Sequence, residues 1–320
     1  QIVDVDYFLN GQKPVIRLFG KTENGKSACV LYDNYMPYFY VKPMNGFLNF
    51  SDAAKDIREI RSLEEVERFV PTGYSEHPAK LIKITLTNPQ DVPRIKEILL
   101  QRKAILAAYE ADILFKYRFL IDHDIRGMQW IDAHTTKTHT TVVNVPAYYA
   151  DSLIPVDNQR NAELKYLAFD IECLPTDATK PLDGQRDPII MIALAFSHPY
   201  KEKTSLVLLA RPFAGSSAIG YESEKQMLEE FVKIIEDYDP DIITGYNVNG
   251  FDVPYILDRL RVLGVSAAFG RATDKKAYSK AISIYHETVV PGRVVVDPYQ
   301  ILKRDPWVKF NRYNLNTIVK

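Results

Sequence analysis

The chain has 320 residues, of which 46% are hydrophobic and 25% are charged, as in ordinary globular proteins, and this length allows two domains with separate cores. Its net charge of −1 excludes a global basic field, so any surface that binds nucleic acid must be local. The two cysteines, Cys29 and Cys173, indicate neither a disulfide framework nor a zinc site, and we expect a cytoplasmic protein. No apolar run is long enough to span a bilayer, so no membrane partner is expected.

Residues 1–126 are predicted to form an α+β domain. Asn10-Gly11 is a strong hairpin signal, and Ser62 to Glu65 has the pattern of a capping box that begins a helix ending near Phe69. A second helix is expected over 91–101. Alternating apolar and polar residues predict strands at 2–7, 14–19, 28–32, 38–41 and 81–86. On these patterns alone, the domain is a scaffold without a pocket.

Residues 127–165 differ in composition and are predicted to form a connecting segment with some strand structure. β-branched and polar residues dominate 135–141. Three histidines, His123, His134 and His139, lie near one another in the sequence. They lack the spacing and the cysteine neighbours of a zinc site, so we interpret them as surface or packing residues rather than metal ligands.

Residues 166–320 are predicted to form an α/β domain. The nearly continuous apolar run 189–196 predicts a central strand buried on both faces. A capping box at Ser223 to Gln226 begins an amphipathic helix, whose apolar residues recur at helical spacing as far as Tyr238. Further strands are expected at 205–210, 242–244 and 293–296, and a further helix at 253–263.

Two carboxylates end the apolar strand predicted at 166–172. Because successive side chains of a strand alternate between its faces, Asp170 and Glu172 project on one side, and Phe169 and Ile171 project on the other. Two like charges this close on an apolar sheet are costly without a cation, and hard oxygen ligands suit Mg²⁺ or Mn²⁺. A strand that simply ends in solvent is the alternative that a lone Asp-x-Glu leaves open.

A second acidic site follows the short strand at 242–244. The segment Gly245-Tyr246-Asn247-Val248-Asn249-Gly250-Phe251-Asp252 is rich in turn-forming residues, and Asp252 stands where the next helix starts. Taken alone, Asp252 is equally well explained as an ordinary helix cap. Tyr246 offers a ring close to this site, but core packing is the favoured interpretation.

The two acidic sites together resemble a known family. Phe169-Asp170-Ile171-Glu172 and Asn247-Val248-Asn249-Gly250-Phe251-Asp252 look like the first and second motifs of the 3′→5′ proofreading exonuclease of family B DNA polymerases. Their order and domain-sized separation make the pair specific, whereas either motif alone is weak. The resemblance implies a ribonuclease-H-like exonuclease fold for 166–320, with a mixed sheet and flanking helices. Strand alternation alone does not distinguish this fold from other α/β sheets.

The resemblance also implies roles for the motif residues. Two metal ions, Mg²⁺ or Mn²⁺, would activate water and stabilise the leaving 3′ oxygen. Asp170 would bridge both ions, Glu172 would bind the ion that activates water, and Asp252 would hold the other ion, partly through water. Asn247 would fix the loop or contact DNA, and Phe251 would stack on an unpaired 3′ terminus, with core packing as the alternative.

The N-terminal domain carries a resemblance of its own. Met36-Pro37-Tyr38, Asn88-Pro89-Gln90-Asp91-Val92-Pro93 and the segment 112–122 look like the N-terminal domain of archaeal family B polymerases. In that family these segments line a pocket that captures uracil in the single-stranded template. Val92 would border the base, and Arg118 would brace the pocket or a phosphate. The pocket residues implied by the resemblance are Pro37, Tyr38, Pro89, Val92, Ile113, Phe115 and Arg118.

The third motif of the family, Tyr-x-x-x-Asp, is absent from the sequence after Asp252. None of the tyrosines there is followed four residues later by Asp, namely Tyr255, Tyr278, Tyr285, Tyr299 and Tyr313. Asp297 is a tempting substitute, but it precedes a proline at a helix start and is interpreted as a cap. Residues 314–319 resemble the segment before the third motif. We therefore expect a chain truncated before that motif, with weak exonuclease activity and no ability to polymerise.

Two functions from different classes remain open. The first is the N-terminal and exonuclease part of a DNA polymerase, with a prokaryotic, nucleoid-associated location. Its expected partners are single-stranded and primer-template DNA, the palm, fingers and thumb of the polymerase, and a sliding clamp. The second is a non-catalytic module that binds DNA and senses uracil. A free-standing ribonuclease-H-like exonuclease is disfavoured, because such an enzyme has no need of the N-terminal domain.

Overall fold

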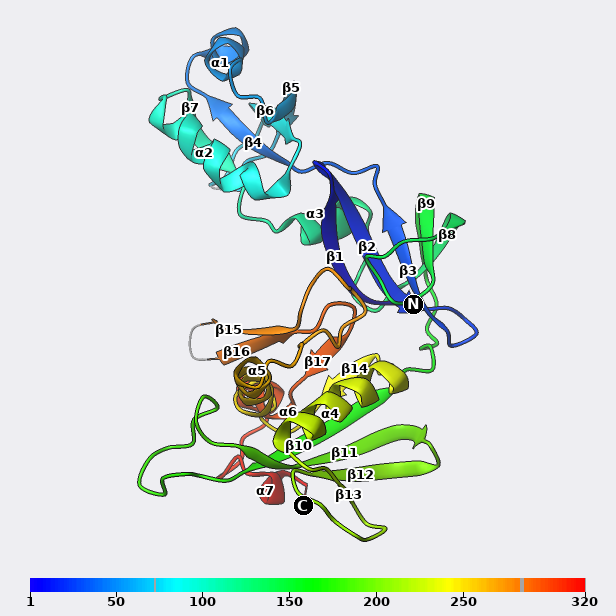
Figure 1. Ribbon diagram of the computed structural model, residues 1–320. Coiled ribbons are helices and arrows are strands. Elements are labelled where there is room, and N and C mark those ends of the chain that lie inside the picture. Colours follow the sequence, from blue (N-terminus) through cyan, green and yellow to red (C-terminus); the bar gives the residue numbers. More distant parts are fainter. Residues whose placement is uncertain (72, 283–284, 320) are drawn as a thin grey trace.

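The computed structural model describes residues 1–71, 73–282 and 285–319. Three bodies follow one another from top to bottom in Figure 1: a small α+β body, a five-stranded sheet, and a six-stranded sheet with helices. The predicted α+β region followed by a mixed sheet with flanking helices is confirmed. Within the described residues, no helix combines the length and the apolar character needed to cross a membrane.

The upper body is a four-stranded antiparallel sheet in the order β5-β6-β4-β7. Apolar side chains of α1 and α2 pack on one of its faces, against Phe39, Ile82 and Ile84. Its elements are β4 (Tyr38–Pro43), α1 (Gly46–Ala54), β5 (Ile60–Arg68), β6 (Ala79–Leu86), the 3₁₀ helix η1 (Pro89–Asp91), α2 (Val92–Gln101) and β7 (Ile105–Tyr109).

The helix predicted from the capping box at Ser62 is wrong, because these residues belong to strand β5. The strand pairs with β6 along its length, and Glu64 and Glu67 lie directly opposite Lys83 and Lys80. Opposite charges across an antiparallel pair stabilise a sheet, and this long-range pairing outweighs the local helix signal.

The middle body is a five-stranded sheet in the order β1-β2-β3-β9-β8, next to the short helix α3. The predicted hairpin forms, with Gly11 at a φ of 63°, a left-handed conformation that suits glycine. The segment 130–156 pairs with β3 through β9, so it completes this sheet. The elements are β1 (Ile2–Asn10), β2 (Lys13–Lys21), β3 (Ser27–Tyr32), α3 (Phe115–Asp122), β8 (Trp130–Thr138) and β9 (Ala147–Val156).

The lower body is a six-stranded mixed sheet in the order β13-β12-β11-β10-β14-β17. Strand β10 is antiparallel to β11 and parallel to β14. A two-stranded hairpin, β15-β16, lies on the side of this body that faces the upper ones (Figure 1). The strands are β10 (Tyr166–Cys173), β11 (Ile189–Tyr200), β12 (Lys203–Leu209), β13 (Ile219–Gly220), β14 (Ile242–Thr244), β15 (Tyr278–Ile282), β16 (Tyr285–Val289) and β17 (Val294–Val296). The helices are α4 (Glu224–Tyr238), α5 (Asp252–Val262), α6 (Pro298–Arg304) and α7 (Leu315–Ile318).

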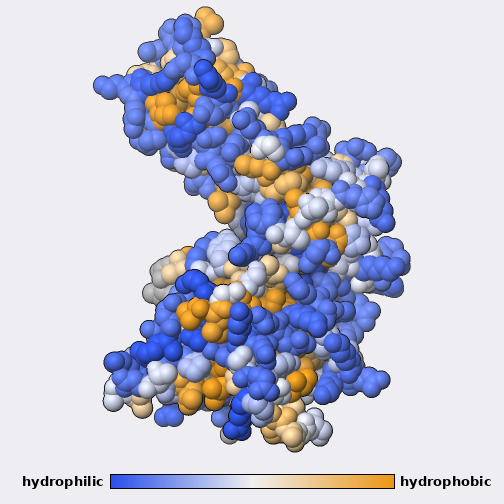
Figure 2. Space-filling view, viewed as in Figure 1, coloured by the Kyte–Doolittle hydropathy of each residue, from blue (hydrophilic) through white to orange (hydrophobic). Residues whose placement is uncertain are grey.

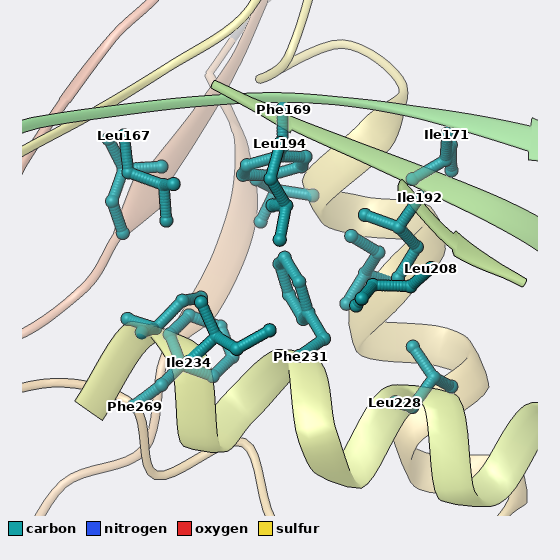
Figure 3. Packing of buried hydrophobic residues seen from close by; sticks show 14 of the residues in the cluster. Leu167, Phe169, Ile171, Ile192, Leu194, Leu208, Leu228, Phe231, Ile234 and Phe269 are labelled. Atoms are coloured by element: carbon teal, nitrogen blue, oxygen red, sulfur yellow. The ribbon is translucent and has the colours of Figure 1, made fainter. Parts of the chain in front are cut away.

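The core of the lower body lies between the sheet and helices α4 and α5. Figure 3 shows Phe169 and Leu194 of the sheet pointing at Phe231 of α4, and the rings of Phe169 and Phe231 meet edge to face with centroids 5.4 Å apart. The N-cap predicted at Ser223 is confirmed, since its side chain accepts a hydrogen bond from the backbone N–H of Gln226. Because both helices cover the same face, β10 has one apolar face and one free face.

The expectation that β11 is buried on both faces is wrong. Ile192 and Leu194 are buried against the helices, but Ala193 and Ala195 are exposed. A continuous apolar run does not reveal that helices cover only one face of an antiparallel pair. The exposed side chains of Ala193 and Ala195 are small, so this face of the sheet has open space beside β10.

A buried ion-pair cluster of the lower body is hydrogen-bonded to the five-stranded sheet. Arg271 is fully buried, and its guanidinium contacts Asp241 at 2.7 Å and Asp239 at 2.9 Å. The same guanidinium donates to the hydroxyl of Ser27 on β3. Asp4 of β1 accepts a hydrogen bond of 2.8 Å from the backbone N–H of Gly292. Charges that are paired and hydrogen-bonded in this way fix how two bodies meet.

Candidate active site

Asp170 and Glu172 both project from the free face of β10. Their side chains are exposed, whereas Phe169 and Ile171 between and beside them are buried, as strand alternation predicts. Across the sheet, Asp170 lies opposite Ala193 of β11. Glu172 lies opposite Met191, so the small neighbouring side chain is beside Asp170 only.

Asp252 is the first residue of α5, but its side chain does not cap that helix. Only 3% of Asp252 is exposed, and its Oδ1 accepts a hydrogen bond of 3.2 Å from the backbone N–H of Ile171. That N–H belongs to the residue between Asp170 and Glu172. The hydrogen bond brings the second motif directly onto the strand that carries the first.

A close approach of backbone to backbone allows this contact. A Cβ added to Gly245 would lie 2.6 Å from the carbonyl oxygen of Phe169, so a side chain cannot be accommodated where the loop leaves β14. The loop then turns through Asn247, which has a φ of 63°. Asn adopts this left-handed conformation more readily than most residues, which explains its presence at the turn.

The buried carboxylate of Asp252 is electrostatically unfavourable. Burial and, to a smaller extent, the negative charge of Asp170 together raise the pKa of Asp252 to about 6. A desolvated carboxylate next to a second carboxylate fits a cation-binding site, because a divalent ion would offset both costs. Hard oxygen donors of this kind favour Mg²⁺ or Mn²⁺.

The three predicted metal ligands do not form one compact group. Within the described ranges, no set of three or more His, Cys, Asp or Glu side chains is arranged to hold a metal ion. Asp170 and Asp252 interact electrostatically, whereas Glu172 extends into solvent from the end of β10. Neighbouring carboxylates repel one another, which favours such a spread arrangement. Participation of Glu172 therefore stays a prediction.

Replacing Asp252 with asparagine is expected to stabilise the protein in EDTA at pH 7. Free aspartate titrates near 3.8 and Asp252 near 6, so between these pH values the folded state keeps a proton that the unfolded state has lost. The free energy of unfolding therefore falls as the pH rises through this window, by about 2 to 3 kcal/mol. Asparagine keeps an acceptor for Ile171 without the charge.

Urea unfolding of the wild type and Asp252→Asn between pH 4 and pH 7 measures this effect. The variant should be more stable at pH 7, and the difference should largely disappear at pH 4. A variant that is less stable than the wild type at pH 7 would show that the carboxylate is well solvated or paired.

Asp297 positions the loop of the second motif. Its carboxylate is 3% exposed and accepts hydrogen bonds of 3.0 Å from the backbone N–H groups of Asn247 and Asn249. It also caps α6 by accepting from Tyr299, so the predicted cap is confirmed. The sequence indicated the cap, but nothing in it indicated that the same carboxylate holds the loop 48 to 50 residues earlier.

Two aromatic side chains flank the loop in different ways. The hydroxyl of Tyr246 donates to the carbonyl oxygen of Tyr313 at 2.7 Å, and its ring meets that of Tyr299 edge to face, so Tyr246 has a packing role. Phe251 is only partly buried, and its ring centroid lies 5.3 Å from that of Tyr255. Phe251 therefore keeps part of its surface free beside Asp252.

A groove of about 500 Å³ begins at Phe251 and is bordered by the loop that follows β10. Lys180 and Arg186 line it. The loop is folded around the carboxylate of Asp187, which accepts hydrogen bonds from the guanidinium of Arg186 and from the backbone N–H and the hydroxyl of Thr176. These hydrogen bonds from Arg186 and Thr176 hold the pKa of Asp187 well below its ordinary range. Sequence reasoning missed this groove, because no residue pattern indicates that the loop folds back beside α5.

A second cavity, of about 760 Å³, lies between the upper body, β1 and α3 of the middle body, and the hairpin β15-β16, at the waist visible on the left of Figure 2. All seven residues of the predicted uracil pocket line it: Pro37, Tyr38, Pro89, Val92, Ile113, Phe115 and Arg118. Sequence reasoning missed the opposite wall, which includes Tyr278, Lys280 and Val289 of the hairpin.

Arg118 is the buried cation of this cavity. It is 7% exposed, forms an ion pair of 2.6 Å with Glu110, and its guanidinium lies 5.0 Å from the ring centroid of Tyr38. Its Nε is buried without a hydrogen-bond partner among the described residues. Buried donors are nearly always paired, so this enclosed Nε is an unsatisfied donor of a residue that lines the cavity.

Comparison with known proteins agrees with this geometry. Residues 106–318 match the family described as DNA polymerase family B, exonuclease domain. The chain is 28% identical to the DNA polymerase delta catalytic subunit of Schizosaccharomyces pombe, over 99% of this chain and 33% of that protein. It is 32% identical to DNA polymerase 2 of Aeropyrum pernix, over 93% of this chain and 36% of that protein.

A solved structure is similar as well. The family B DNA polymerase of the archaeon Pyrobaculum calidifontis superposes with a TM-score of 0.79 and 27% identity, covering 95% of this chain and 37% of that one. The chain thus spans about a third of the length of these relatives. It belongs to the family B DNA polymerases, within the region that holds their exonuclease domain.

Proposed function

We propose that this chain is the template-binding and 3′→5′ proofreading exonuclease part of a family B DNA polymerase. The observation that carries the proposal is the contact between the two motifs. Buried Asp252 accepts a hydrogen bond from the backbone N–H of Ile171, and the negative charge of Asp170 contributes to the raised pKa of Asp252. A buried carboxylate beside a second carboxylate destabilises the fold, so a strand with a purely structural role is not expected to carry this arrangement.

The residues of the free face suit a single DNA strand. Asp170, Glu172 and Asp252 would hold Mg²⁺ or Mn²⁺, which would supply an activated water and charge stabilisation. The free part of Phe251 offers a surface on which a terminal base stacks, and Asp297 holds the loop in place by accepting a hydrogen bond from the backbone N–H of Asn247. The small side chains of Ala193 and Ala195 on β11 leave room for the sugar and phosphate on the free face of the sheet.

The test of this function is the direction of cleavage. A protein that contains this chain together with the polymerase region of its relatives is given single-stranded DNA labelled at the 5′ end. The label should remain on products that shorten stepwise from the 3′ end, only when Mg²⁺ or Mn²⁺ is present. Release of the label as a short fragment, or cleavage in EDTA, would contradict the proposal. The alternative of a non-catalytic DNA-binding module predicts no cleavage.

We further propose that the cavity of about 760 Å³ binds uracil in single-stranded template DNA. The support is that the seven residues implied by the resemblance line one cavity, Arg118 among them. Such a cavity would accept uracil and exclude thymine by shape, since the 5-methyl group would meet Val92. The partners that we propose for the function as a whole are single-stranded and primer-template DNA, the remaining polymerase domains, and a sliding clamp.

Val92→Gln is expected to remove a preference for uracil. The longer side chain would fill the space next to the base, so oligonucleotides with uracil and with thymine should bind equally. Fluorescence anisotropy with two oligonucleotides that differ only at that base measures the ratio of their Kd values. Glu97→Gln, an exposed residue of α2 outside the cavity, is the control and should leave the ratio unchanged. Equal Kd values for both oligonucleotides with the wild type would refute uracil recognition.

A further inference from the structure

The segment 303–313, which runs from the end of α6 towards α7, combines aromatic and basic side chains. Trp307 is 91% exposed, more than almost any other large apolar side chain of the described chain. The exposed cations around it are Lys303, Arg304, Lys309 and Arg312, against a single acid, Asp305. The whole chain has a net charge of −1, so this is a local concentration of positive charge.

Internal contacts hold this segment in a defined shape. The Oδ1 of Asp305 accepts hydrogen bonds from the backbone N–H groups of Trp307 at 2.8 Å and Val308 at 3.1 Å. This Asx turn presents the indole to solvent. The ammonium group of Lys303 lies 4.2 Å from the ring centroid of Tyr313, which anchors the other end.

The same segment is tied to the candidate active site. The carbonyl oxygen of Tyr313 accepts from the hydroxyl of Tyr246, the residue immediately before Asn247. Asp297, just before α6, holds the backbone of Asn247 itself. Figure 1 draws α4 above the six-stranded sheet and α7 below it. Asp170 and Glu172 are exposed on the face of β10 that α4 does not cover, which is the side of α7. The segment ends at Tyr313, two residues before α7, so its end lies on the same side of the sheet as the carboxylates.

We infer that residues 303–313 form an auxiliary subsite for single-stranded DNA, with one base stacked on Trp307 and its phosphates on Lys309 and Arg312. The inference rests on the proposed function only in taking DNA as the ligand. Stacking on an exposed aromatic side chain among cations is a usual way to bind single strands without sequence preference. Lysine is depleted at the centre of protein interfaces, whereas tryptophan and arginine are enriched there, so a protein partner is the alternative that the absence of quenching by DNA would favour.

Tryptophan fluorescence tests the inference directly. The chain has two tryptophans, and Trp130 donates its indole N–H to the carbonyl oxygen of Arg160, so Trp130→Phe leaves Trp307 as the only reporter. In EDTA, which prevents cleavage, an oligo-dT of twelve nucleotides should quench the emission in a saturable way. Trp307→Ala should weaken binding about tenfold, measured by anisotropy of a labelled oligonucleotide, and Trp307→Phe should weaken it less.

Salt dependence separates phosphate contacts from stacking. The double variant Lys309→Gln with Arg312→Gln should reduce the slope of log Kd against log salt concentration by about 1.4, since each phosphate contact on a single strand contributes about 0.7. Lys225→Gln, an exposed lysine of α4, is the matched control and should leave the slope unchanged.

Two results would overturn the subsite: unchanged Trp307 emission when anisotropy shows binding, or wild-type affinity in Trp307→Ala. Failure of the proposed function is distinguishable from this. Quenching at Trp307 without any 3′→5′ cleavage by the longer protein would refute the exonuclease and leave the subsite standing. Cleavage by the longer protein without quenching at Trp307 would refute the subsite and leave the exonuclease standing.

Discussion

Asp170→Ala is expected to lower the rate of single-strand hydrolysis by several orders of magnitude in a protein that carries this chain and the rest of the polymerase. Asp170 is the exposed carboxylate of β10 whose charge reaches Asp252, so its loss would remove the ligand shared by both motifs. A group that acts in the transition state has an effect of this size, because its loss is not compensated elsewhere.

The control is Asp52→Ala, which removes an exposed carboxylate from α1 in the upper body. It should leave the rate unchanged, while Asp170→Ala keeps affinity for DNA and loses turnover. Turnover within a few-fold of the wild type in Asp170→Ala would mean that hydrolysis takes place elsewhere or belongs to a contaminating nuclease.

A second large effect is expected from adding a third carboxylate site. In this sequence no tyrosine after Asp252 is followed four residues later by Asp. The carboxylate of Asp297 already accepts hydrogen bonds from the backbone N–H groups of Asn247, Asn249 and Tyr299. The chain of 320 residues should therefore hydrolyse single-stranded DNA far more slowly than a protein that also carries the family's Tyr-x-x-x-Asp motif. Single-turnover rates with Mg²⁺ make the comparison. Similar rates for both would show that two motifs suffice.

The parts of the site that were predictable from the sequence depend on local geometry. Strand alternation is a property of the backbone, so the exposure of Asp170 and Glu172 and the burial of Phe169 follow once β10 is recognised. The cap at Asp297 was predictable for the same reason, since an acid before Pro298 at a helix start has few other roles.

The parts that were not predictable depend on contacts between distant segments. Ser62 to Glu65 has a helical signature, and only pairing with β6 makes it a strand. The alanines of β11 are apolar by composition, yet they are exposed because α4 and α5 lie on one face. The hairpin wall of the cavity, with Lys280, belongs to a different body from Val92, and no sequence pattern links them.

The most direct test of the metal site is the effect of Mn²⁺ on thermal unfolding of this chain, which requires neither DNA nor the remaining polymerase domains. A ligand that binds only the folded state stabilises it by about 2.7 kcal/mol at a hundred times its Kd. Tm of the wild type should rise with Mn²⁺ concentration, and Tm of Asp170→Ala should stay constant. An equal rise in both proteins would contradict a metal site formed by Asp170, Glu172 and Asp252.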